Sequence, residues 1–114
     1  MNATVGDGAD GYLLVGSLSS CQAAAKSATE QALAALNGAR PVLALVLVDV
    51  AWQMLFEAQP GADVAAVHEA LGPDVPLIGG YTLGQIVPGA EGQPPQFLNQ
   101  HMVVVAFGEM PEKK

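Results

Sequence analysis

An uninterrupted aliphatic run at residues 42–48 constrains the fold more than any other part of the sequence. The run shows no alternation of apolar and polar residues, and Asp49 ends it. A strand of this composition is typical of the centre of a sheet that is covered by helices on both faces. We therefore predict a central strand here, buried on both sides.

Three segments predict helices, one before this strand and two after it. Before it, Ser19 and Gln22 have the spacing of a capping box, and small apolar residues follow at helical steps: Cys21, Ala25, Ala28, Ala32 and Leu36. Asn37 and Gly38 suit the left-handed turn that closes a helix. After the strand, residues 51–58 predict one or two helical turns. Residues 62–71 predict a longer helix whose inner side carries Val64, Val67 and Leu71.

Three further apolar runs predict strands, at residues 12–15, 75–78 and 102–107. Strands that alternate with helices indicate parallel pairing. The predicted fold is a single α/β domain with a βαβαβ core and a mostly parallel sheet. The last strand follows a predicted loop at residues 84–96 and is expected to pair antiparallel with the segment around Tyr81. We expect residues 1–10 to form a disordered lead-in, residues 11–109 the domain and residues 110–114 a frayed tail.

Composition excludes several classes of function. The chain carries four Lys and Arg residues and a formal net charge of −7, whereas nucleic-acid binding requires clustered basic residues. No apolar stretch reaches the roughly 20 residues that span a bilayer, so membrane insertion is not expected. A single cysteine excludes an internal disulfide, and together these features predict a cytoplasmic location.

The charged fraction is also informative. It is only 13%, with 51% hydrophobic residues, against about a quarter charged in a typical soluble domain. Either the fold is strongly buried, or part of its surface packs against another protein surface.

Ligands in open α/β sheets bind beyond the carboxyl ends of the strands. This rule selects three places: the turn at residues 16–18, Asp49, and the stretch Gly79, Gly80, Tyr81 and Thr82 with the loop that follows it. The glycines would let a ligand approach the backbone, and the hydroxyl groups would bind it; alternatively, the glycines accommodate a bulge. Asp49 would bind an amine, or it caps the helix that follows it.

No set of residues predicts catalysis, a cofactor or a metal. Cys21 lies on the inner helix face, where an unpaired cysteine behaves as a small apolar residue. His68 and His101 lie far apart in the sequence, with no further ligand at metal-binding spacing. We therefore expect no enzyme activity, no cofactor and no metal, although an enzyme that uses Asp49 or Cys21 remains the third alternative.

The residues from 75 to 88, VPLIGGYTLGQIVP, resemble the signature of the FIST C-terminal domain, which reads roughly vP-aGfYtyGEIaP. That family carries HNQT before a hydrophobic strand, and this chain has Leu98, Asn99, Gln100 and His101 before its own. The alanine-rich helix and the strand after Arg40 and Pro41 are similar too. The resemblance covers roughly residues 12–108.

The chain departs from the family at several positions. The cysteine and arginine of the family's sCvaR are absent around Trp52, and Gln85 stands for the glutamate of GEI. Leu98 and His101 stand for the histidine and threonine of HNQT. A ligand that depends on that arginine or glutamate would bind this chain differently.

The resemblance implies a sensory domain in signal transduction that binds a small ligand such as an amino acid. Its pocket would use Gly79, Gly80, Tyr81, Thr82 and Gln85, with Asp49 and Asn99 nearby. We expect the chain to be part of a longer FIST protein or a separate relative. The alternative is an assembly module, which would form a homo-oligomer or pack against a partner domain.

Overall fold

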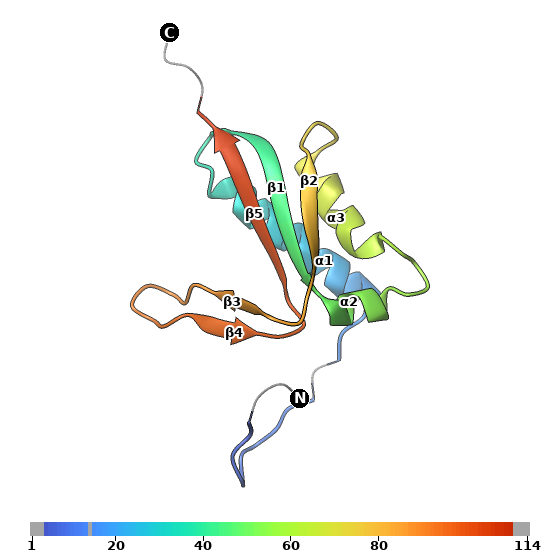
Figure 1. Ribbon diagram of the computed structural model, residues 1–114, viewed down its shortest axis with the longest axis vertical. Helices are drawn as coiled ribbons and strands as arrows, with labels where there is room; N and C mark the ends of the chain where they lie inside the picture. The colour runs from blue at the N-terminus through green and yellow to red at the C-terminus, as the bar shows by residue number, and fades with distance from the viewer. Residues whose placement is uncertain (1–3, 14, 111–114) are drawn as a thin grey trace.

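The computed structural model describes residues 4–13 and 15–110, and within them it contains three helices and five strands (Figure 1). In chain order these are α1 (Leu18–Ala34), β1 (Arg40–Asp49), α2 (Val50–Leu55), α3 (Ala62–Leu71), β2 (Leu77–Thr82), β3 (Gln85–Val87), β4 (Gln96–Leu98) and β5 (Met102–Glu109). The mixed α/β class is therefore as predicted.

The main sheet has the order β2-β1-β5, with β1 at its centre. β1 pairs parallel with β2 and antiparallel with β5. The antiparallel direction of the last strand was predicted, but its predicted partner was wrong, because β5 lies beside β1 and not beside the segment around Tyr81. With one parallel pair in a three-stranded sheet, the predicted βαβαβ layout with a mostly parallel sheet is not observed.

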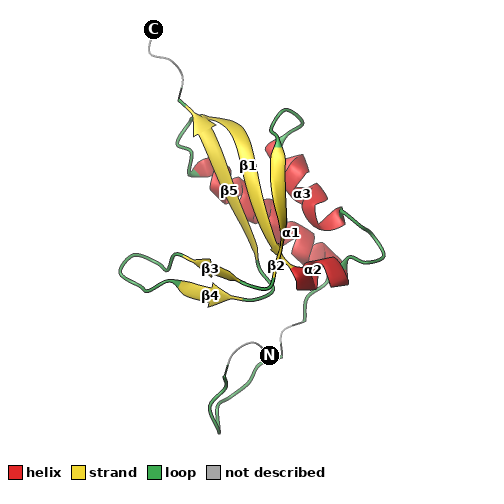
Figure 2. Cartoon of the chain, viewed as in Figure 1, coloured by secondary structure: helices red, strands yellow, loops and turns green. Residues whose placement is uncertain are grey.

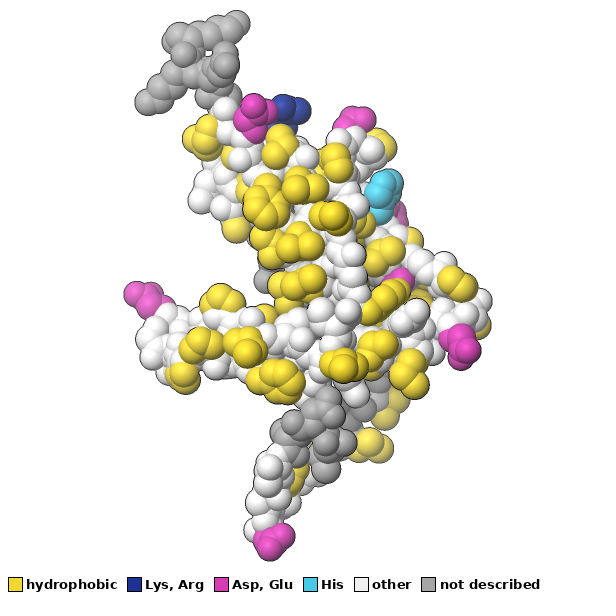
Figure 3. All heavy atoms as spheres, in the orientation of Figure 1, with side chains coloured by type: hydrophobic (Ala, Val, Ile, Leu, Met, Phe, Trp, Pro, Cys, Tyr) yellow, Lys and Arg dark blue, Asp and Glu magenta, His cyan; other side chains and the backbone are white. Residues whose placement is uncertain are grey.

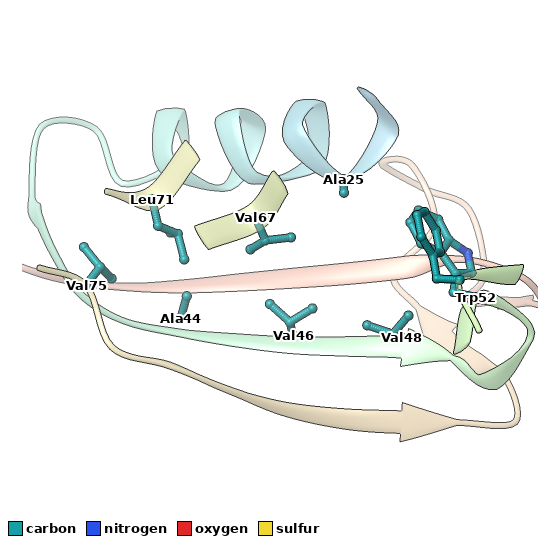
Figure 4. Close-up of a cluster of buried hydrophobic side chains, with 9 residues drawn as sticks. Ala25, Ala44, Val46, Val48, Trp52, Val67, Leu71 and Val75 are labelled. Carbon is teal, nitrogen blue, oxygen red and sulfur yellow. The ribbon is translucent and has the colours of Figure 1, made fainter. Parts of the chain in front are cut away.

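All three helices lie on one face of this sheet (Figure 2). Alternate residues of β1, namely Ala44, Val46 and Val48, are buried under them, and Val67 and Leu71 of α3 meet these residues from above (Figure 4). The prediction that β1 is buried on both faces was wrong. Leu43, Leu45 and Leu47 point to the other face and stay partly exposed, because no described element covers it.

The helix α1 begins two residues earlier than the predicted capping box implies. Ser17 is the N-cap, and its side chain accepts a hydrogen bond from the backbone N–H of Ser20, whose own hydroxyl accepts from the backbone N–H of Ser17. The predicted pair, Ser19 and Gln22, has the same spacing as the observed pair, Ser17 and Ser20, and either could satisfy two N–H groups at a helix start, so spacing alone selected the wrong pair. The predicted left-handed turn is confirmed, with positive φ at Asn37 and Gly38.

The strand predicted at residues 12–15 is wrong within the described residues. Tyr12, Leu13 and Val15 are in no strand and are each nearly nine-tenths exposed or more; Leu14 lies outside the described residues. An apolar run forms a strand only where an edge is available to pair with it and a layer to cover it.

The predicted loop at residues 84–96 is instead most of a hairpin. β3 pairs antiparallel with β4, and Ile86 lies opposite Phe97. The hairpin projects from the end of the main sheet as an arm (Figure 1). Its strands are three residues long each, too short for a periodic signal to stand out among glycine and proline.

Candidate functional site

Two adjacent glycines in β2 have opposite surroundings. A β-carbon placed at Gly79 would lie 1.9 Å from the carbonyl oxygen of Val46, so the parallel pairing with β1 excludes any side chain there. A β-carbon at Gly80 would meet no heavy atom within 4 Å. Gly79 therefore has a structural role, which is a close approach of two backbones and not the predicted bulge, because the register of β1 and β2 is regular at this position.

A cavity of about 270 Å³ lies between α3 and the sheet strands β1 and β2. Val64 of α3 and Val46 and Val48 of β1 contribute its apolar walls, and Gly79, Gly80 and Tyr81 complete it. Three of the predicted binding residues thus line one cavity. Its volume is slightly below the roughly 300–1,000 Å³ of pockets for drug-sized ligands.

Tyr81 also lines a second cavity, of about 210 Å³, at the N-terminal end of α3. There its hydroxyl donates a hydrogen bond of 2.6 Å to Oδ2 of Asp63. Asp63 is fully buried, and its other oxygen, Oδ1, is buried with no hydrogen-bond partner. A buried acceptor without a donor costs about 1–3 kcal/mol, so this oxygen marks an unsatisfied position.

The electrostatics of this pair follow from its surroundings. Asp63 occupies the first turn of α3, where the positive end of the helix dipole favours a carboxylate. The hydrogen bond to Asp63, burial and the charge of Asp63 together raise the pKa of Tyr81 from 10.0 to about 12. Tyr81 therefore keeps its proton and remains a donor at neutral pH.

The sequence did not select Asp63, although a signal was present. An acidic residue in the first helical turn is ordinarily explained by the helix dipole alone. Asp63 nevertheless precedes Val67 and Leu71 at steps of four, and both are buried. This periodicity places the carboxylate on the inner face of α3, where it must find a partner.

Both carboxylate oxygens of Asp49 accept hydrogen bonds from backbone N–H groups. Its Oδ1 accepts a hydrogen bond from the N–H of Ala51 at the start of α2, and its Oδ2 accepts one from the N–H of Gln100. The helix-capping alternative for Asp49 therefore describes its observed contacts. The same carboxylate also ties α2 to the turn that precedes β5.

Thr82 and Gln85 belong to the same corner of the fold. The Thr82 hydroxyl donates to the carbonyl oxygen of Val48, and the Gln85 side-chain N–H groups donate to Thr82 Oγ1 and to the carbonyl oxygen of His101. Gln85 is buried, and its Oε1 has no partner. These contacts hold the hairpin arm against the sheet.

The predicted binding residues therefore separate into two groups. Gly79, Gly80 and Tyr81 line the cavities beside α3, whereas the remaining residues lie at the corner where β1 ends and β5 begins: Asp49, Thr82, Gln85 and Asn99. Asn99 is half-buried in the turn before β5, and its carbonyl oxygen contacts Nδ1 of His101.

A third cavity, of about 400 Å³, lies between the start of α1 and the same corner. Cys21, Trp52 and His101 are among its lining residues. Burial raises the pKa of the Cys21 thiol, which lowers the fraction of the nucleophilic thiolate. The indole N–H of Trp52 donates to the carbonyl oxygen of Gln100, and its ring stacks with Phe56.

Among the described residues, no group of three or more His, Cys, Asp or Glu side chains is placed to hold a metal ion. None of the helices in the described part of the chain has the length and apolarity needed to cross a membrane.

Comparisons of the chain with protein-family models, with curated proteins and with solved structures find no match. The resemblance to the FIST C-terminal domain therefore depends on the quoted motifs alone.

Proposed function

We propose that this chain is a sensory domain that binds a small ligand in the cavities beside α3. The observation that carries the proposal is the buried Oδ1 of Asp63, which lacks a donor while the Tyr81 hydroxyl occupies Oδ2. A ligand that carries an ammonium or another strong donor would satisfy this oxygen. An amino acid, the ligand class that the family resemblance implies, has such a group.

The dimensions of the cavities support a ligand of this size. The cavity that Asp63 lines, at about 210 Å³, is about seven times the roughly 30 Å³ that one water occupies in the liquid. The neighbouring cavity of about 270 Å³ has apolar walls. Tyr81 contributes to both, so a ligand with a polar head and a short apolar body would use the two together.

Tyr81 would act as the moving part of this site. Its side chain is 44% exposed, whereas Asp63 beneath it is fully buried. A ligand reaches the carboxylate when Tyr81 swings outward, and the bound state is then stabilised by the ligand's contacts with Asp63. The ligand would thereby shift the population between two positions of Tyr81, which provides a signal that a partner domain can read.

The test is a thermal-shift and calorimetric titration of the purified chain with the proteinogenic amino acids and with simple primary amines. A ligand at about a hundred times its dissociation constant stabilises the folded state by about 2.7 kcal/mol. We expect Asp63→Asn to abolish this shift, because the neutral amide no longer attracts a cation. Glu57→Gln removes the same charge at an exposed residue lining the same cavity and should retain most of the affinity.

Equal loss of binding in both variants would show that only net charge matters, and would refute the role of Asp63. The absence of any stabilising amine or amino acid, in a sample shown to be folded by circular dichroism, would refute the proposed ligand class.

A further inference from the structure

The face of the main sheet opposite the helices is apolar, and no element within residues 4–13 and 15–110 covers it. We call it the open face and define it by residues of all three strands: Leu43, Leu45, Leu47, Ile78, Val103, Val105 and Phe107. The strand register brings these residues together, since Leu45 lies beside Val105 on one side and Ile78 on the other. Ile78 is 61% exposed, Phe107 47% and Val105 38%.

The open face carries no net charge, although the chain as a whole has a formal charge of −7. The charged residues of its strands are Arg40 and Glu109 at one end, which form an ion pair with each other, and Asp49 at the other end of β1, which is buried and accepts two backbone hydrogen bonds. Figure 3 shows apolar side chains over the three strands with charges at the margins. Two copies of this acidic chain can therefore approach through the open face without the like-charge repulsion that opposes contact elsewhere.

The exposed area of the chain is large for its mass. Its accessible surface is 8369 Å², whereas a compact monomer of 11.6 kDa exposes about 5,800 Å². The excess of about 2,500 Å² is roughly three times the 800 Å² that each partner buries in a standard interface. The N-terminal segment and the hairpin arm project from the main sheet and contribute to this excess (Figure 1).

The open face alone would not bury enough area for a stable dimer. The eight residues of β5 at ~3.3 Å each and three strands at ~4.8 Å spacing give a footprint of about 400 Å², half of what a partner usually buries. The hairpin arm can supply the remainder. Its cross-strand pair Ile86 and Phe97 is 76% and 53% exposed, and apolar side chains of the arm appear on the same side of the molecule (Figure 3).

We propose that a second copy of this chain covers the open face. The two sheets would pack face to face around a two-fold axis, about 10 Å apart as in a β-sandwich. The hairpin arm of each copy would extend over the end of the other copy's face. The open face consists of aliphatic and aromatic side chains, with the Arg40–Glu109 ion pair at one end. Such a surface is complementary to a second copy of itself under two-fold symmetry.

The test is sedimentation equilibrium of the full chain from micromolar to tens of micromolar concentration. We expect a dimer, with a melting temperature that rises with protein concentration. Val105→Lys places a lysine from each copy in the apolar interface and should raise the dimer dissociation constant at least about a hundredfold. Met54→Lys adds the same charge to a residue of α2 that is 73% exposed, away from the open face, and should leave the dimer intact.

Ile86→Lys keeps the test valid if Val105→Lys does not fold, because Ile86 is exposed in the arm and makes little contribution to the monomer core. It should weaken the dimer by at least about tenfold. A monomeric wild-type chain throughout the concentration range would overturn the proposal, as would equal weakening by Met54→Lys. Asp63→Asn should not change the mass of the assembly, so failure of this proposal and failure of the proposed ligand site are separate results.

Discussion

Gly79 and Gly80 are neighbours in β2, yet replacing each by alanine should have opposite effects on stability. At Gly79 the new β-carbon would lie 1.9 Å from the carbonyl oxygen of Val46, a backbone atom of the central strand. At Gly80 it would meet no heavy atom within 4 Å. The two substitutions add the same atom to the same strand, so each is the control for the other.

The magnitude of the Gly79→Ala effect follows from this geometry. The distance between the new β-carbon and the carbonyl oxygen of Val46 must increase by about 1 Å or more to relieve the overlap. No side-chain rotation can provide this space, because the obstructing atom belongs to the backbone of β1. Overpacking of this kind costs about 1–3 kcal/mol, and each hydrogen bond lost between β1 and β2 adds about 0.5–1.5 kcal/mol. We expect Gly79→Ala to lower the free energy of unfolding by about 2–4 kcal/mol.

Gly80→Ala should change the free energy of unfolding by less than about 1 kcal/mol, and in the stabilising direction where alanine restricts the unfolded chain. The measurement is the urea midpoint and slope for both variants and the wild type, followed by circular dichroism. Equal destabilisation by the two substitutions would refute the reasoning, because it would mean that loss of glycine in β2 matters and the approach to Val46 does not.

Two further predictions concern the polar side chains. With Tyr12→Phe as background, a spectroscopic titration should give Tyr81 a pKa of about 12, and Asp63→Asn should lower it toward 10. Because the folded-state pKa is raised, the stabilising contribution of this pair is complete below pH 10 and is lost as the pH rises through about 12. Asp49→Ala should destabilise the chain by about 2–3 kcal/mol, since it leaves the backbone N–H groups of Ala51 and Gln100 without their acceptor. Asp49→Asn should recover only part of that stability in a thermal melt, because its single amide oxygen can replace only one of the two carboxylate acceptors and its NH2 group would face the other N–H donor.

The elements that the sequence predicted correctly are those whose signal is local. The aliphatic run became β1, the segment at residues 62–71 became α3, and Asn37 with Gly38 formed a left-handed turn. Each depends on the periodicity or backbone preferences of adjacent residues. The run at residues 12–15 has a similar local signal and forms no strand where it is described, because a strand also needs a partner strand and a covering layer.

The candidate site was predicted in part for the same reason. Strand ends indicated Tyr81 and the two glycines, and these line the cavities beside α3. Asp63 was missed because its partner, Tyr81, lies 18 residues along the chain. Only the packing of α3 against the sheet brings the two side chains together.

The sequence by itself determined the local elements, the acidic charge and the presence of more apolar residues than a small core can bury. The tertiary structure decided where those residues go. Side chains alternate between the two faces of a strand, so a wholly aliphatic β1 supplies two apolar faces, but all three helices lie on one of them. Which face is covered depends on contacts between distant segments, and for that reason the open face could not be located from the sequence.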